Sequence, residues 1–253
     1  MRLRQVALAS RDLDAVTRQF HDVFGLKVAY NDPGIIHYGL KNAVLSAGTA
    51  FLEVVEPVRE DASAARFLNR RGGDAGYMVI LQTADAEAER ARAVALGARV
   101  VDDIDSANYR CAHFHPADFG GVLVSFDQQR NEPDFLEPFG DWWPAGPNWR
   151  DTQTDEVLAV TAVTLATPDP DALASRWSEL LGKPLDARNS RRLPLDRGEI
   201  RFARGPAGAS TSIAALDLKV ADVAGTLERG RAAGLTVDGG GVSIGGVSFI
   251  PIP

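Results

Sequence analysis

The sequence predicts an α+β fold built from one small unit that occurs four times. Each copy consists of a short apolar strand, a capping aspartate, an amphipathic helix and a closing glycine. The distance from the aspartate to the glycine is 12 or 13 residues and alternates between these values, so the copies form two pairs. Several short extended runs separate the helices, and one helix for every three or four strands is an α+β pattern. The copies begin at Leu3, Tyr77, Val160 and Ser212.

The first copy, LRQVALASRDLDAVTRQFHDVFG, shows the pattern in full. Asp12 stands at the N-cap position, apolar residues follow at three- and four-residue spacing, and Gly25 stands where a helix would end in the left-handed conformation. A connecting helix is predicted within residues 59–71. Extended runs separated by turn residues are predicted at residues 27–30, 35–40, 43–47 and 50–57.

The segment 129–155 has a different composition from the repeated units. It contains four prolines and three of the four tryptophans, which is untypical of a flexible linker. We therefore expect a packed belt between two domains. The predicted domains are residues 1–128 and residues 156–253.

Length and charge limit the class of protein. A chain of 253 residues with 45% apolar content can bury a substantial core, and a net charge of −7 does not favour a nucleic-acid or anionic-membrane partner. No run approaches the roughly 18 apolar residues of a membrane span, and we expect no leader, because a strand is predicted from the first residues. The single cysteine, Cys111, excludes an intrachain disulfide and fits a reducing compartment. We expect a cytoplasmic protein, either monomer or homodimer.

The paired units resemble the vicinal oxygen chelate superfamily, which includes glyoxalase I, methylmalonyl-CoA epimerase, extradiol dioxygenases and bleomycin-type resistance proteins. The likeness to methylmalonyl-CoA epimerases is carried by FLEVVEPV, ARFLNRRGG and HPADFGGVLVSFDQ. It covers roughly residues 1–128, whereas residues 156–253 share only the general pattern. The resemblance implies four βαβββ modules that form two cupped-sheet domains of the glyoxalase/bleomycin-resistance type, each suited to a small-molecule ligand.

The resemblance also implies four metal-ligand positions, which this chain fills with Gln5, Glu53, Met78 and Ser125. Gln5 and Glu53 offer hard oxygen atoms, but a thioether and a neutral hydroxyl are poor ligands for a first-row ion. The usual set is therefore incomplete: no residue is assigned as a metal ligand, and both the cofactor and the binding of a divalent metal are left open. Strand alternation places Gln5, Glu53 and Met78 on the ligand side of their strands.

Each candidate side chain has a functional and a structural interpretation. Glu53 is the predicted catalytic residue, as a general base whose pKa is raised by burial, or it is a carboxylate paired with an arginine. His113, together with His115, completes a rearranged metal site with Glu53, or it is a packed feature beside a proline turn. Cys111 is expected to contribute packing rather than a nucleophile. The predicted ligand-binding residues are Gln5, Met78, Ser125 and His113.

The second half of the chain lacks ligand-type residues at the equivalent strand positions, Ala162 and Ala215. We expect residues 156–253 to hold no metal and to act mainly by packing. Six arginines occur within residues 188–204. They either receive a carboxylate or phosphate, or form a solvated strand surface.

Three functional hypotheses follow. The first is a lyase, isomerase or dioxygenase that acts on a small oxygen-bearing metabolite in the amino-terminal cup, with Glu53 as acid/base. The second is a metal-independent binding protein of the resistance type that sequesters a small molecule without turnover. The third is a scaffold whose second half is structural or mediates dimerisation.

Overall fold

The computed structural model describes residues 1–253 and has the predicted α+β architecture, with five α-helices, fifteen strands and four short 3-10 helices. The strands belong to two mixed sheets, of eight and seven strands. The helices are α1 (Leu13–Phe24), α2 (Ser63–Arg71), α3 (Ala86–Ala95), α4 (Pro170–Leu181) and α5 (Val223–Ala232). The strands are β1 (Arg2–Ala9), β2 (Val28–Tyr30), β3 (Leu40–Ala47), β4 (Ala50–Pro57), β5 (Ala75–Gln82), β6 (Val100–Asp105), β7 (Tyr109–Phe114), β8 (Leu123–Gln129), β9 (Val157–Thr167), β10 (Arg192–Pro194), β11 (Glu199–Arg204), β12 (Ser212–Val220), β13 (Val237–Asp238), β14 (Gly241–Ile244) and β15 (Val247–Ile252).

The four repeated helices begin at the predicted aspartates. In each case the aspartate side chain accepts a hydrogen bond from the backbone N–H three residues later, which satisfies one of the unpaired donors of the first turn. The closing glycines have positive φ, as predicted, because a left-handed residue without a Cβ ends a helix at little steric cost. The capping residues are Asp12, Asp85, Asp169 and Asp222.

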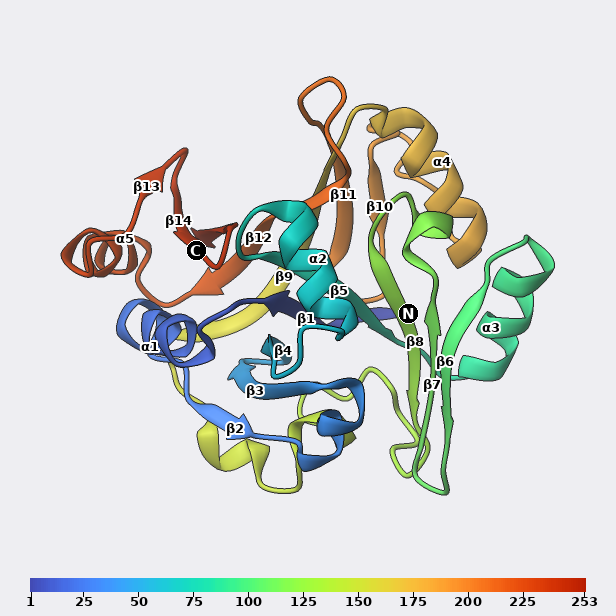
Figure 1. Cartoon of the computed structure of the whole chain (residues 1–253), viewed down its shortest axis with the longest axis horizontal. Coiled ribbons are helices and arrows are strands. Elements are labelled where there is room, and N and C mark those ends of the chain that lie inside the picture. The colour runs from blue at the N-terminus through green and yellow to red at the C-terminus, as the bar shows by residue number, and fades with distance from the viewer. The chain divides into compact units, whose positions relative to one another are not determined.

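The contacts divide the chain into two compact units. The first unit comprises residues 1–4, 78–143 and 161–214. Its strands run in the orders β5-β8-β7-β6 and β10-β11-β9, and helices α3 and α4 lie side by side at the right of Figure 1. Trp177 of α4 is fully buried, meets the ring of Phe119 edge-on and donates its indole N–H to the Phe119 carbonyl at 3.1 Å.

The second unit comprises residues 5–77, 144–160 and 215–253. Its strands run in the orders β2-β3-β4-β1 and β12-β15-β14-β13. Helix α1 lies beside α5 at the left of Figure 1, and Phe249 of β15 meets Phe20 and Phe24 edge-on. Each unit therefore combines one module from either half of the chain. The domains 1–128 and 156–253 follow the sequence repeat instead of these contacts and stay a prediction.

The belt of residues 129–155 is packed, as its composition indicated. Trp142 and Trp149 are each only 1% exposed. In the first unit Trp142 contacts Tyr109, and in the second unit Trp149 meets Phe51 edge-on. The guanidinium of Arg4 donates to the Gly140 carbonyl at 2.8 Å, which holds the first part of the belt.

One predicted strand is wrong. Residues 35–40 do not form an extended run, because Pro33–Tyr38 is a 3-10 helix and β3 begins only at Leu40. The Asp32 side chain accepts from Gly34 N, and proline at the first position is suited to a helical start. The predicted connecting helix within 59–71 is confirmed as α2.

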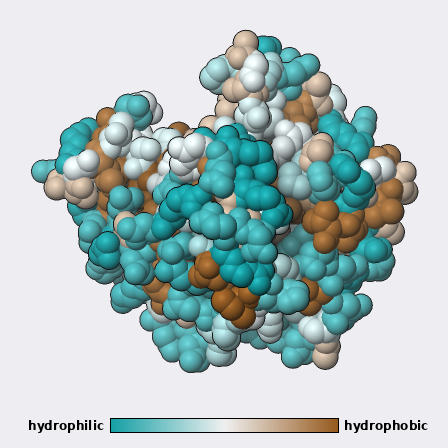
Figure 2. Space-filling view, viewed as in Figure 1, coloured by the Kyte–Doolittle hydropathy of each residue, from teal (hydrophilic) through white to brown (hydrophobic).

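The face of the molecule in Figure 2 is mostly hydrophilic, with small separate groups of hydrophobic residues. None of the helices has both the length and the apolar character that crossing a bilayer requires.

Candidate functional site

Glu53 on β4 is the centre of a buried polar cluster in the second unit. Asn42 Nδ2 on β3 donates to its Oε1 at 2.7 Å, and Gln5 Nε2 on β1 donates to its Oε2 at 2.9 Å. The parallel register pairs Ala7 with Glu53, so side chains two residues apart on β1 share the same face as Glu53. The prediction that Gln5 and Glu53 lie on one face is confirmed. Asn42 was not predicted, although alternation along β3 indicates it.

The surroundings of Glu53 favour its neutral form. Burial raises the pKa of Glu53, while the hydrogen bonds from Asn42 and Gln5 act in the opposite direction. The alternative that Glu53 pairs with an arginine is wrong, because its side-chain partners are the two amides. A carboxyl group held by two donors and without a counter-cation is suited to take up and release a proton.

A second buried carboxylate, Asp127 on β8, lies in the first unit. Ser125 Oγ donates to one of its oxygens and Tyr109 Oη to the other. Burial raises the pKa of Asp127 to about 7, against the opposing effect of these two hydrogen bonds. A carboxyl group that titrates near neutrality is matched to acid–base chemistry. Asp127 was not predicted, although it follows Ser125 by two residues and so lies on the same strand face.

His113 on β7 lies on this face as well. The antiparallel register pairs His113 with Ser125 and Cys111 with Asp127. His113 Nδ1 is 3.6 Å from an Asp102 oxygen, and its Nε2 is 3.6 Å from Cys111 Sγ. Burial lowers the pKa of His113, and the nearby Asp102 carboxylate opposes this effect. The predicted ligand-binding residues Ser125 and His113 are thus brought together.

His115 does not share this environment. Its Nδ1 accepts from Ala117 N at the start of the short helix Pro116–Phe119, and it lies 3.2 Å from an Arg99 nitrogen. The hypothesis that His113 and His115 complete a rearranged metal site with Glu53 is wrong, because these side chains do not form a group that could hold a metal ion. Strand β7 ends at Phe114, and His115 caps the short helix that begins at Pro116.

Strand β5 adds two further side chains to this face. Met78, a predicted ligand-binding residue, is buried and pairs with Leu123, while Gln82 pairs with Asp127. Gln82 is 2% exposed, and its side-chain oxygen accepts no hydrogen bond. An unpaired buried amide oxygen costs about 1–3 kcal/mol, so it is a natural acceptor for a donor group of a ligand. Gln82 was not predicted, and alternation from Met78 indicates it.

The donor groups do not fit an ordinary metal centre. A divalent ion that activates a substrate needs three or four nitrogen or oxygen ligands that point toward it. No three His, Cys, Asp or Glu side chains are grouped in this way. Gln5 instead directs its NH2 group to Glu53, and Ser125 directs its hydroxyl proton to Asp127.

The fold and these clusters define an α+β protein with buried acid–base groups on the faces of its strands. A family model described as a glyoxalase-like domain matches residues 6–181. The chain belongs to this family of glyoxalase-like domains, and the predicted membership of the vicinal oxygen chelate superfamily is confirmed.

Relatives of known description match about half of the chain. The ethylmalonyl-CoA/methylmalonyl-CoA epimerase of Cereibacter sphaeroides is 28% identical over 131 residues, which are 50% of this chain and 97% of that protein. A Streptomyces coelicolor methylmalonyl-CoA epimerase in complex with 2-nitronate-propionyl-CoA is 25% identical, with a TM-score of 0.47, over 51% of this chain and 97% of that chain. The Mycobacterium tuberculosis methylmalonyl-CoA epimerase is 26% identical, with a TM-score of 0.45, over 50% of this chain and 87% of that chain.

Proposed function

We propose that this protein is an isomerase-type enzyme that moves a proton on a small oxygen-bearing metabolite, with Glu53 as the acid/base. The observation that carries the proposal is the buried Glu53 carboxyl, which is held by Asn42 and Gln5 and has a raised pKa. The curated relative is an epimerase of CoA thioesters by its description, so a CoA thioester is the first substrate class to test.

Proton transfer at the carbon beside a thioester carbonyl suits a carboxylate that is held in a fixed orientation. Glu53 takes a proton from the carbon beside a thioester carbonyl, and the electron pair of the broken C–H bond becomes part of the enolate. Glu53 then releases this proton to solvent, and a solvent proton adds to the opposite face of the same carbon, so that substrate and product are epimers and no further reactant is needed. Asn42 and Gln5 position the carboxylate, because each holds one of its two oxygens.

The test is proton exchange in heavy water. Wild-type protein is incubated in D2O with a panel of 2-substituted acyl-CoA thioesters, and mass spectrometry measures deuterium at the α-carbon. We expect Glu53→Gln to lower the exchange rate by about 10²–10⁴-fold, the usual contribution of a positioned acid/base, with an unchanged thermal melting profile. Glu60→Gln, an exposed glutamate on the following turn, is the matched control and should exchange like wild type.

A second candidate function is binding without turnover. It is favoured by one observation: Glu53, Asn42 and Gln5 satisfy one another, as a purely structural polar cluster would. In that case calorimetry would show uptake of a panel compound that wild-type protein does not exchange. Exchange by wild type that survives Glu53→Gln would contradict the role of Glu53. Lyase and dioxygenase activities, the cytoplasmic location and the monomer or homodimer state stay predictions.

A further inference from the structure

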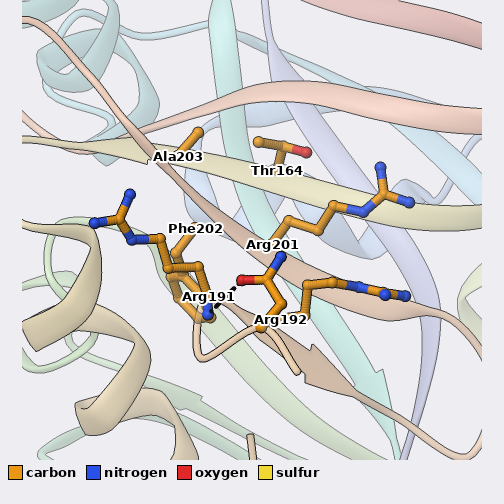
Figure 3. Close-up of a pocket in the computed structure, with 7 residues that line it drawn as sticks. Thr164, Arg191, Arg192, Arg201, Phe202 and Ala203 are labelled. Carbon is orange, nitrogen blue, oxygen red and sulfur yellow. Dashed lines mark hydrogen bonds between the residues drawn. The ribbon is translucent and has the colours of Figure 1, made fainter. Parts of the chain in front are cut away.

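A shallow hollow of about 660 Å³ lies over strands β9, β10 and β11 of the first unit. Thr164 of β9, Arg192 of β10 and Arg201 of β11 line it, together with Asn189 and Arg191 of the preceding turn. Figure 3 shows the side chains of Arg192 and Arg201 extending in the same direction, while Arg191 points the opposite way. The volume falls within the range of about 300–1,000 Å³ typical of small-molecule sites.

The repeat explains why these side chains share a face. In the first module Glu53 of β4 pairs with Ala7, which lies five residues before the capping aspartate of α1. In the third module Arg201 of β11 pairs with Thr164, which lies five residues before the capping aspartate of α4. Arg201 therefore occupies the place of Glu53 in its own module. The same position carries the opposite charge, so this face is suited to an anion.

Three arginines line the hollow, and two of them share one buried carboxylate. Glu199 is buried and binds both Arg192, from Nε at 2.9 Å, and Arg201, so one carboxylate is shared by two guanidinium groups. Arg191 adds no excess charge, because it forms a bidentate pair with Asp171 at 2.7 Å. Residues 186–204 contain six arginines and only three carboxylates, in a chain whose net charge is −7. The local field is therefore positive.

Two donors at the hollow are not used within the protein. Arg192 binds Glu199 through Nε and Nη2, which leaves its Nη1, and the Thr164 hydroxyl forms no hydrogen bond. The Arg192 side chain is 44% exposed, so a ligand can reach it. A guanidinium group beside a hydroxyl matches the oxygens of a phosphate or a carboxylate.

We propose that this hollow binds the oxyanion of a small metabolite, a phosphate or a carboxylate, through Arg192, Arg201 and Thr164. The site goes beyond the function proposed for Glu53, since it uses other residues and requires no turnover. It also goes beyond the expectation from the sequence that the second half acts mainly by packing.

The test is calorimetric titration of the full chain with inorganic phosphate and, separately, with malonate, at constant ionic strength set by sodium chloride. We expect saturable binding of at least one anion with a Kd below about 1 mM. Arg192→Gln should weaken that binding about 10-fold, and Thr164→Val, which keeps the side-chain shape, about 3-fold. Arg188→Gln removes an arginine of the same turn region that does not line the hollow, and it should leave the Kd unchanged.

The outcomes distinguish a phosphorylated ligand from a carboxylate ligand, and they distinguish this anion site from the function proposed for Glu53. Tighter phosphate binding identifies a phosphorylated ligand, and tighter malonate binding identifies a carboxylate. Absence of saturable binding, or equal losses in Arg188→Gln and Arg192→Gln, would overturn the site. Thermal melting monitors folding, and Thr164→Val decides the matter if Arg192→Gln does not fold. Glu53→Gln should bind the anion like wild type, so failure of either proposal leaves the other intact.

Discussion

At the scale of single residues, two buried carboxyl groups are held by different kinds of donor. Glu53 accepts from two amides, whereas Asp127 accepts from two hydroxyls. In both, burial opposes ionisation and raises the pKa, and the hydrogen bonds compensate only in part. Of the two groups, Asp127 has a pKa of about 7 and so can exchange a proton near neutral pH, and the pKa of Glu53 is shifted in the same direction.

Asp127 should make stability depend on pH. Its pKa is 3.8 for the free group and about 7 in the folded protein, so the folded state holds a proton that the unfolded state has already released. This favourable contribution is complete below about pH 4 and is lost as the pH rises through about 7, at about 1.4 kcal/mol per pH unit. The measurement is urea unfolding of wild type and Asp127→Asn at about pH 5 and about pH 7.

The difference in the free energy of unfolding between the two proteins isolates the titration of Asp127, since the other titrating groups are common to both. We expect the free energy of unfolding of Asp127→Asn to rise relative to wild type as the pH increases. Parallel pH profiles for the two proteins would contradict the raised pKa.

At the scale of elements, the turn between β3 and β4 depends on a glycine for two separate reasons. Gly48 has a φ of +64°, and a Cβ at this position would lie 1.9 Å from the Leu158 carbonyl oxygen. Gly72, which ends α2, has a similar φ of +76° but open space around the position of a Cβ. A comparison of the two glycines therefore distinguishes the cost of a left-handed backbone conformation from the cost of a close contact at the Cβ position.

Alanine at these two glycines should have unequal effects. Gly72→Ala should lower the free energy of unfolding by about 1–2 kcal/mol, the cost of a left-handed residue with a Cβ. Gly48→Ala should lower it by more, because the backbone of β9 at Leu158 must also move. Chemical denaturation of both variants measures the difference, and equal losses would show that the contact with Leu158 is relieved without cost.

At the scale of the whole molecule, each compact unit needs residues from both halves of the sequence. In the second unit Phe249 is fully buried against Phe20 and Phe24 of α1. A fragment of residues 1–155 lacks Phe249 and the strand that carries it, so the fragment should expose the apolar face of α1. We expect the fragment to self-associate or to bind a hydrophobic dye, as measured by size-exclusion chromatography and ANS fluorescence.

A point substitution tests the same packing in the intact chain. Phe249→Ala should lower the free energy of unfolding by about 3–5 kcal/mol, since it leaves a cavity among buried rings. Phe139→Ala, at a side chain that is 49% exposed, is the control and should change stability much less. A monomeric fragment 1–155 with a sharp melting transition would instead support independent domains with the predicted limits.

The sequence alone determined those features that depend on neighbouring residues. The four capping aspartates, the closing glycines and the common face of Gln5 and Glu53 follow from helix and strand periodicity, which acts over a few residues. The run at 35–40 was misassigned because the cap at Asp32 and the proline after it outweigh apolar composition.

Which distant groups meet is a property of the folded chain. Strand register places Asn42 beside Glu53 and Tyr109 beside Asp127. It also leaves the side-chain oxygen of Gln82 unpaired, and it puts Arg201 in the third module at the position that Glu53 has in the first. The raised pKa of Asp127 likewise depends on its burial by residues far away in the chain. Solvent exclusion and long-range pairing are properties of the folded arrangement, so no local pattern in the sequence specifies them.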